Sequence, residues 1–170
     1  MKYNPDFHHR QSIRLNGYDY LRSGAYFITI CTDEREYLFG DIVNEEIELN
    51  TLGDIARSHW QQLSQHHPNI IMDESIVMPN HLHGIIVLES STGSTKSISE
   101  IIRGFKTFSA KAINKERGLR GVSVWQRNYY DRIIRNELEL DRVRQYIINN
   151  PRNWDTDKNN QTQSVIHTDL

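Results

Sequence analysis

The sequence predicts an α+β domain built around an antiparallel sheet. Three observations lead to this prediction. Short runs rich in β-branched and aromatic residues are typical of strands, and longer segments carry apolar residues at helical spacing. Along the chain these segments follow one another as β, hairpin, α, β, β, α, β, α. The length of 170 residues fits one domain with a single core.

Strands are expected in short apolar runs that have turn-forming residues on both sides. Residues 25–32 are rich in aromatic and β-branched side chains and are expected to be buried. Residues 84–88 are too apolar for a surface strand. The other expected strands are residues 37–43 and 47–49 as a hairpin, 70–78, 81–88 and, as an extended segment or edge strand, 125–134.

Three helices are expected from caps and apolar stripes. Asn50 or Thr51 caps the first, and Ser97 with Glu100 forms a capping box for the second, whose stripe runs from Ile98 through Phe108 to Ile113. Asn136 caps the third, which ends before Pro151. Strand pairs around two helices indicate a ferredoxin-like antiparallel sheet with the helices packed on one face. Residues 1–154 are expected to form the domain and 155–170 a disordered tail.

The charge of the chain is unevenly distributed. Residues 96–152 hold 13 of the 20 Lys and Arg but only 6 of the 22 Asp and Glu, although the net charge is -2. Such a basic half is compatible with a polyanion partner or with a solvated helix surface, and the aromatic residues among the charges favour nucleic acid. No run is apolar enough to cross a membrane, so a cytoplasmic protein is expected, and a nucleic-acid partner would associate it with the nucleoid. The single Cys31 excludes an intrachain disulfide.

His81 and His83 form a candidate metal pair. Residues two apart in a strand point to the same face, so two neutral imidazoles can bind one divalent ion. A third ligand must come from elsewhere, and a plain pair of hydrogen-bonded histidines is the alternative.

Tyr146 and Asn150 form the second candidate pair. They lie four residues apart, so they share one face of the last helix, and the Asn150 amide oxygen is a hard donor. Tyr146 can act as a nucleophile if a metal polarises its target. The alternatives are a half-buried core tyrosine and an ordinary helix stop at Asn149-Asn150-Pro151.

These segments resemble a known family, the HUH-type single-tyrosine transposases, and within it the REP-associated tyrosine transposases. The similarity extends from about Arg10 to Trp154, in the order found in the family. The segments that carry it are Gly24-Ala25-Tyr26-Phe27-Ile28-Thr29, Met78-Pro79-Asn80-His81-Leu82-His83-Gly84, Arg103-Gly104-Phe105-Lys106, Trp125-Gln126-Arg127-Asn128-Tyr129-Tyr130 and Tyr146-Ile147-Ile148-Asn149-Asn150-Pro151.

The resemblance implies a ferredoxin-like fold and a DNA strand-transfer reaction. His81 and His83 match the metal pair, with Mg²⁺ or Mn²⁺ as the ion. Asn150 stands where relatives carry a polar third ligand, often Gln. Tyr146 matches the nucleophile, which forms a 5′-phosphotyrosine link with single-stranded DNA near a hairpin.

The resemblance also leads to expectations about the residues that contact DNA and about the oligomeric state. The residues expected to contact DNA are Arg103, Lys106, Arg127, Tyr129 and Tyr130. Both a homodimer with the tyrosine donated in trans and a monomer are compatible with the family. The alternatives are a hairpin-DNA or RNA binding module that kept the fold without the chemistry, and a metal-dependent hydrolase that needs no tyrosine.

Overall fold

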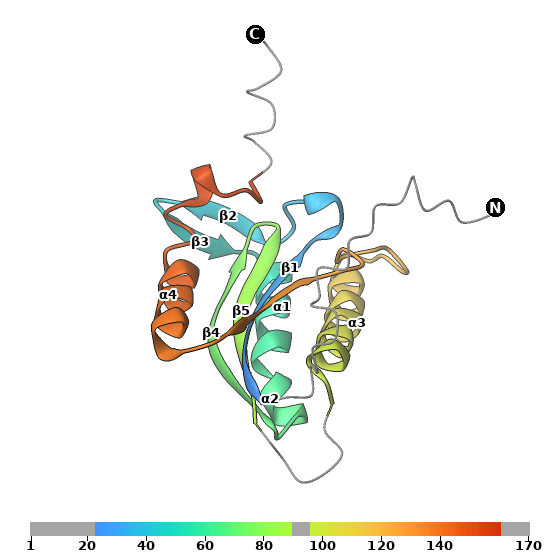
Figure 1. The fold of residues 1–170 in the computed structure, drawn as a ribbon. Helices are drawn as coiled ribbons and strands as arrows, with labels where there is room; N and C mark the ends of the chain where they lie inside the picture. The colour runs from blue at the N-terminus through green and yellow to red at the C-terminus, as the bar shows by residue number, and fades with distance from the viewer. Residues whose placement is uncertain (1–22, 90–95, 161–170) are drawn as a thin grey trace, which may run out of the picture.

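The main sheet has four strands in the order β4-β5-β1-β6, and all neighbouring strands are antiparallel. The computed structural model describes residues 23–89 and 96–160 (Figure 1). Its elements are β1 (Gly24–Cys31), η1 (Asp33–Arg35), β2 (Gly40–Val43), β3 (Glu46–Leu49), α1 (Thr51–Gln61), α2 (Leu63–His66), β4 (Ile70–Met78), β5 (His81–Leu88), α3 (Ile98–Glu116), β6 (Tyr130–Ile134), α4 (Glu137–Ile148) and η2 (Trp154–Thr156).

The order of elements confirms the predicted α+β, ferredoxin-like class. The elements β1, α1, β4, β5, α3 and β6 follow the β-α-β-β-α-β order of that fold. The hairpin of β2 and β3 forms a separate two-stranded sheet between β1 and α1. Of the extended segment or edge strand expected over residues 125–134, only Tyr130–Ile134 forms a strand, β6, at one end of the sheet. Among the described residues, no helix is long and apolar enough to cross a membrane.

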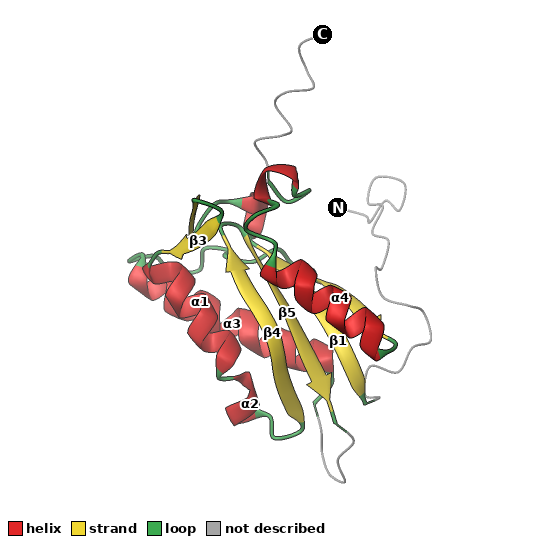
Figure 2. Cartoon of the chain, turned by 90° about the vertical axis from the view of Figure 1, so that its left-hand side faces the viewer, coloured by secondary structure: helices red, strands yellow, loops and turns green. Residues whose placement is uncertain are grey.

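The two faces of the sheet are covered by different helices. On one face, Tyr26 and Ile28 of β1 belong to the main core, which includes Trp60 of α1 and Phe105 of α3. On the other face, a smaller cluster joins Ile85 and Ile134 of the sheet to Val143 and Ile147 of α4. Figure 2 shows α4 on the side of the sheet opposite α1 and α3.

The expectation that the helices pack on one face therefore holds for α1 and α3 but is wrong for α4. Alternate residues of a strand point to opposite faces, so Ala25 and Phe27 lie opposite the main core and need an apolar cover of their own. The apolar stripe of α4 supplies that cover.

The predicted helix caps are confirmed. Asn50 and Asn136 each accept a hydrogen bond from a backbone N–H three residues later, at 3.0 and 2.9 Å. Ser97 and Glu100 form the predicted capping box at the start of α3. One residue of the predicted stripe differs, because Phe108 is 66% exposed at the edge of the buried face of α3.

The chain after α4 folds back onto the end of the sheet. Trp154, Asp157, Asn159 and Asn160 are all buried. Asn159 O accepts a hydrogen bond from Asn80 Nδ2 at 2.8 Å, and Tyr37 donates to Asn160 Oδ1 at 2.7 Å. The predicted disordered tail is therefore wrong for residues 155–160, since Asn159 and Asn160 are buried and make hydrogen bonds to residues distant in sequence. Residues 161–170 lie outside the described part of the chain.

Candidate active site

His81 and His83 occupy the start of β5, directly after the Pro79-Asn80 turn. Both side chains are fully buried, at 0% and 1% exposure, and their ring centroids lie 4.5 Å apart. Thr29 of β1 lies opposite His83 in the sheet register, and its Oγ1 is 2.8 Å from His83 Nδ1. Since His83 belongs to the same face of β5 as Ile85, the pair points toward the α4 side of the sheet.

Asn80 determines which nitrogen of His81 is free. The Asn80 amide donates from Nδ2 to two carbonyls, Arg35 O at 3.2 Å and Asn159 O at 2.8 Å. Its Oδ1 must therefore be the atom that faces His81 Nδ1, at 2.9 Å. An oxygen acceptor at that position requires a proton on Nδ1, which leaves a lone pair on Nε2. A histidine that binds a metal through one ring nitrogen usually donates the N–H of its other ring nitrogen to an oxygen acceptor in the same way.

Three buried polar atoms of the candidate ligand side chains have no hydrogen-bond partner among the described residues. They are Nε2 of His81, Nε2 of His83 and Oδ1 of Asn150. Buried polar atoms normally find partners, because leaving one unpaired costs about 1–3 kcal/mol. A cation among these atoms would satisfy all three at once.

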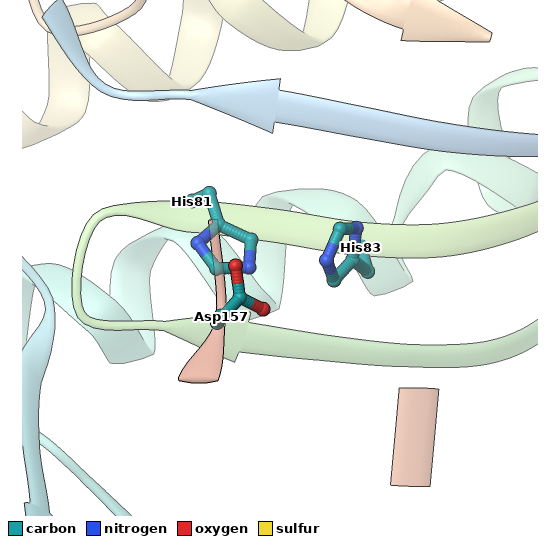
Figure 3. A group of neighbouring side chains, drawn as sticks. All are labelled: His81, His83 and Asp157. Carbon is teal, nitrogen blue, oxygen red and sulfur yellow. The ribbon is translucent and has the colours of Figure 1, made fainter. Parts of the chain in front are cut away.

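Asp157 brings a carboxylate to the same place. One ligand atom from each of His81, His83 and Asp157 lies within 4.8 Å of the others, and Figure 3 shows the carboxylate beside the imidazoles. Asn150 Nδ2 donates to Asp157 Oδ2 at 3.1 Å, and the backbone N–H of Asn159 donates to Oδ1 at 2.7 Å. Two imidazoles, a carboxylate and an amide oxygen are a donor set that fits a divalent metal ion.

Burial keeps both histidines neutral, as metal ligation requires. Burial lowers the pKa of His81 to about 4, although the nearby Asp157 carboxylate and the Asn150 side chain oppose the shift. Burial, together with the neighbouring His81, holds the pKa of His83 well below its usual value.

Tyr146 lies beside the histidines on α4. Its ring centroid is 5.3 Å from that of His83 and 5.9 Å from that of Phe27, and the side chain is 41% exposed. Partial burial raises the pKa of Tyr146, the charge of Asp157 raises it further, and Asn150 opposes both effects. A cation that neutralises Asp157 would therefore also make the Tyr146 phenol easier to ionise.

Two kinds of contact hold α4 in place under Tyr146. Val143 and Ile147 pack into the apolar cluster on the sheet. Arg144 donates from Nε and Nη2 to the two carboxylate oxygens of Asp73 in β4, at 2.8 and 2.7 Å. Such a two-point ion pair fixes orientation as well as distance.

The residues expected to contact DNA do not form one exposed surface. Arg103, Arg127 and Tyr130 are exposed, and their contact with DNA stays a prediction. Lys106 is half-buried and donates to the carbonyls of Gln126 and Arg127. Tyr129 is 8% exposed in the main core, so its ring has no free face for stacking on a base.

Sequence reasoning missed Asp157, Asn80 and Thr29. Asp157 lies in a polar stretch that carried no helix or strand pattern; the one available signal was Trp154, an apolar ring in that stretch. Its ring lies over His81, with centroids 6.0 Å apart. In the sequence, Asn80 follows a proline and Thr29 lies in a run of strand-forming residues, and neither pattern indicates a contact with a histidine.

Several known proteins have similar sequences or a similar fold. Residues 22–150 match the profile of the family described as "Transposase IS200 like". A Haemophilus influenzae protein of unassigned function is 39% identical over 175 residues, covering 92% of this chain and 96% of the relative. A second H. influenzae protein, assigned by its name to the REP-associated tyrosine transposases, is 28% identical over 148 residues, which cover 78% of this chain and 73% of that protein.

A solved structure shows the same fold. It is the structure of a REP-associated tyrosine transposase bound to a REP hairpin, with a TM-score of 0.60 and 23% identity, covering 85% of this chain and 76% of that one. The family profile spans most of the sequence and includes His81, His83, Tyr146 and Asn150. This confirms the family expected from the sequence: the chain belongs to the IS200-like transposases.

Proposed function

We propose that this chain is a metal-dependent DNA strand transferase that cleaves and rejoins single-stranded DNA beside a hairpin. The observation that carries the proposal is a cluster of buried ligand atoms from His81, His83 and Asp157 beside the half-exposed Tyr146, with the Nε2 atoms of both histidines lacking a hydrogen-bond partner among the described residues. Membership of the transposase family supports a DNA reaction. The similar REP-associated transposase is bound to a REP hairpin, which supports hairpin DNA as the substrate here.

His81, His83 and Asn150, together with Asp157, would hold Mg²⁺ or Mn²⁺. When bound, the ion supplies positive charge that polarises the scissile phosphate and stabilises the charge that develops during transfer. The two imidazole nitrogens favour Mn²⁺, whereas Mg²⁺ prefers oxygen ligands.

Tyr146 is the proposed nucleophile. Its phenolic oxygen attacks the scissile phosphorus, and the bond from phosphorus to the 3′ oxygen of the preceding nucleotide breaks. The phenolic proton passes to solvent, and the departing 3′ oxygen takes up a proton. The product is a 5′-phosphotyrosine link and a free 3′-OH.

The second step reverses the first with a different strand. Another 3′-OH attacks the phosphotyrosine, and the Tyr146 oxygen leaves and is protonated. One phosphodiester is replaced by another in the complete reaction, so no external energy source is required.

The test is formation of a covalent protein–DNA adduct. End-labelled single-stranded DNA carrying a hairpin from the flanks of the gene is incubated with protein and Mn²⁺ or EDTA and resolved on a denaturing gel. We expect a metal-dependent shifted band that disappears in Tyr146→Phe. Tyr130→Phe is the matched control, because Tyr130 is exposed to a similar extent, 43% against 41%, and the substitution removes its hydroxyl but keeps the ring that would contact DNA.

The same gel separates the alternatives. An adduct in Tyr146→Phe would contradict the assignment of the nucleophile. Cleavage without any adduct, unchanged in Tyr146→Phe, would indicate a metal-dependent hydrolase. Binding without cleavage would indicate a module that kept the fold without the chemistry.

A further inference from the structure

A groove outside the candidate active site lies at the C-terminal end of α3. It has a volume of about 890 Å³ and is lined by α3 and by the loop that follows it. Three of its lining residues, Lys111, Lys115 and Arg120, are cationic and exposed, and no described lining residue is acidic. Lys111 and Lys115 are one helical turn apart, so they project from the same side of α3.

The cations of this groove are available to a partner. Within residues 23–89 and 96–160, Lys111, Lys115 and Arg120 form no ion pair. The nearby Arg117 differs, since its Nη2 lies 3.9 Å from Glu36 Oε1. A concave surface with three unpaired positive charges and no carboxylate is complementary to a polyanion.

The shape of the groove is held by Asn114. Its buried side chain donates from Nδ2 to Val122 O at 2.7 Å, and its backbone carbonyl accepts from Leu119 N at 2.8 Å. Gly118 and Gly121 both have φ of +68°, and a Cβ at either would meet nothing within 4 Å. The loop is thus anchored to α3. At the two glycines its backbone is not covered by other groups of the described residues, so a ligand can approach it closely.

The chain that leaves the groove leads to the strand beside the histidine pair. This segment pairs with the end of β1: Asp33 N donates to Val124 O, and Gln126 N donates to Cys31 O, both at 2.9 Å. Cys31 is the register partner of His81. Figure 1 shows the end of α3 and the loop after it at the same end of the molecule as the turn between β4 and β5.

We propose that this groove binds the phosphate backbone of the substrate DNA next to the strand that enters the candidate active site. The proposal rests on the proposed function for its polyanion, and it names a surface on the α3 side of the sheet, separate from the metal residues on the α4 side. Lys115 on the helix and Arg120 on the loop would neutralise phosphates on either side of the groove.

The test compares two double variants that carry the same change of net charge. Lys115→Gln/Arg120→Gln alters the groove. Arg57→Gln/Lys96→Gln is the control, with Arg57 on the exposed side of α1 and Lys96 beside His67, just before the opposite end of α3. Fluorescence anisotropy measures binding of a blunt hairpin and of a hairpin-free single strand at several salt concentrations, without added metal.

We expect the groove variant to bind DNA at least about tenfold more weakly, with a slope of log affinity against log salt smaller by about 1.8 for duplex or about 1.4 for single strand. The control should stay within about twofold of the unmodified protein. Weakening on the blunt hairpin assigns the groove to the stem, and weakening only on the single strand assigns it to the flanking strand.

Equal behaviour of the two variants on both DNAs would overturn the groove proposal. Because binding is measured without cleavage, the result does not depend on the adduct. A protein that binds DNA but forms no adduct contradicts the proposed chemistry while the groove can still be confirmed. A protein that binds neither DNA contradicts both proposals. Circular dichroism of both variants verifies that they are folded.

Discussion

Oδ1 of Asn80 lies 2.9 Å from Nδ1 of His81, and this contact determines which nitrogen of His81 faces the candidate metal site. The orientation of the amide is itself determined by two backbone carbonyls, Arg35 O and Asn159 O. The loop after β1 and the chain after α4 therefore both act on the histidine through a single asparagine. Asn80 is a positioning residue in the proposed site, because it contacts the proposed ligand His81 and is not itself proposed to bind the metal.

Removal of this contact should weaken metal binding. In Asn80→Ala, His81 can adopt the other tautomer, which places a proton on Nε2, and we expect Mn²⁺ affinity to fall by about 10- to 100-fold. Isothermal titration at fixed pH measures the change. Ser109→Ala is the control, since Ser109 also makes two buried hydrogen bonds but lies in the main core. Mn²⁺ affinity that falls equally in both variants would indicate a general loss of stability and no role for the tautomer.

The third ligand can be identified by comparing Asn150 with Asp157. If the carboxylate binds the metal, Asp157→Asn lowers Mn²⁺ affinity by about tenfold or more, because it removes the one negative charge of the donor set. Asp155→Asn is the control, because Asp155 lies in the same segment but is exposed. Mn²⁺ titration followed by electron paramagnetic resonance reads the free ion directly.

The contrary outcome is equally informative. Unchanged affinity in Asp157→Asn with a loss in Asn150→Ala would make Asn150 the ligand and Asp157 only its hydrogen-bond partner.

Gly84, next to His83, is required by the packing of α1 on the sheet. A Cβ at residue 84 would overlap the ring of Trp60, which is 1% exposed. We expect Gly84→Ala to lower the free energy of unfolding by about 1–3 kcal/mol. Gly104→Ala is the matched control, since nothing lies within 4 Å of a Cβ there, and it should stabilise α3 by up to about 1 kcal/mol. Denaturant unfolding measures both, and equal stability of the two variants would contradict the predicted overlap.

The ion pair between Arg144 of α4 and Asp73 of β4 should give a pH-dependent contribution to stability. Hydrogen bonds from Arg144 hold the pKa of Asp73 below its usual value. A lowered carboxyl pKa contributes stability above the unfolded pKa of about 3.9, and this contribution is lost as pH falls through the folded pKa. We expect Asp73→Asn to lower Tm by about 2 °C at pH 7, with the difference from the unmodified protein narrowing below about pH 4.

Asp141 provides a comparison for this prediction. It also contacts Arg144, at 3.0 Å, but its side chain is 67% exposed. Asp141→Asn should therefore change Tm less than Asp73→Asn does at pH 7. A constant difference between the unmodified protein and Asp73→Asn down to pH 2 would show that the ion pair is not the cause.

Local patterns in the sequence determined a large part of this protein. Strand alternation placed His81 and His83 on one face, helical spacing placed Tyr146 and Asn150 one turn apart, and the caps at Asn50, Ser97 and Asn136 were recognisable from neighbouring residues. These features depend on the repeat of two residues in a strand, the repeat of 3.6 residues in a helix, and contacts within one helical turn. All of these involve only residues that are close in sequence, so they can be recognised from a short segment.

The tertiary structure decided what depends on contacts between distant segments. It placed α4 on the face opposite α1 and α3, since Phe27 and Ile85 needed an apolar cover there. It brought Asp157 to the histidines and used Lys106 to hold two carbonyls of the loop before β6. A polar side chain in a short segment carries no sign of whether it will be buried or which distant group will pair with it, because the free energy of burying it depends on those partners.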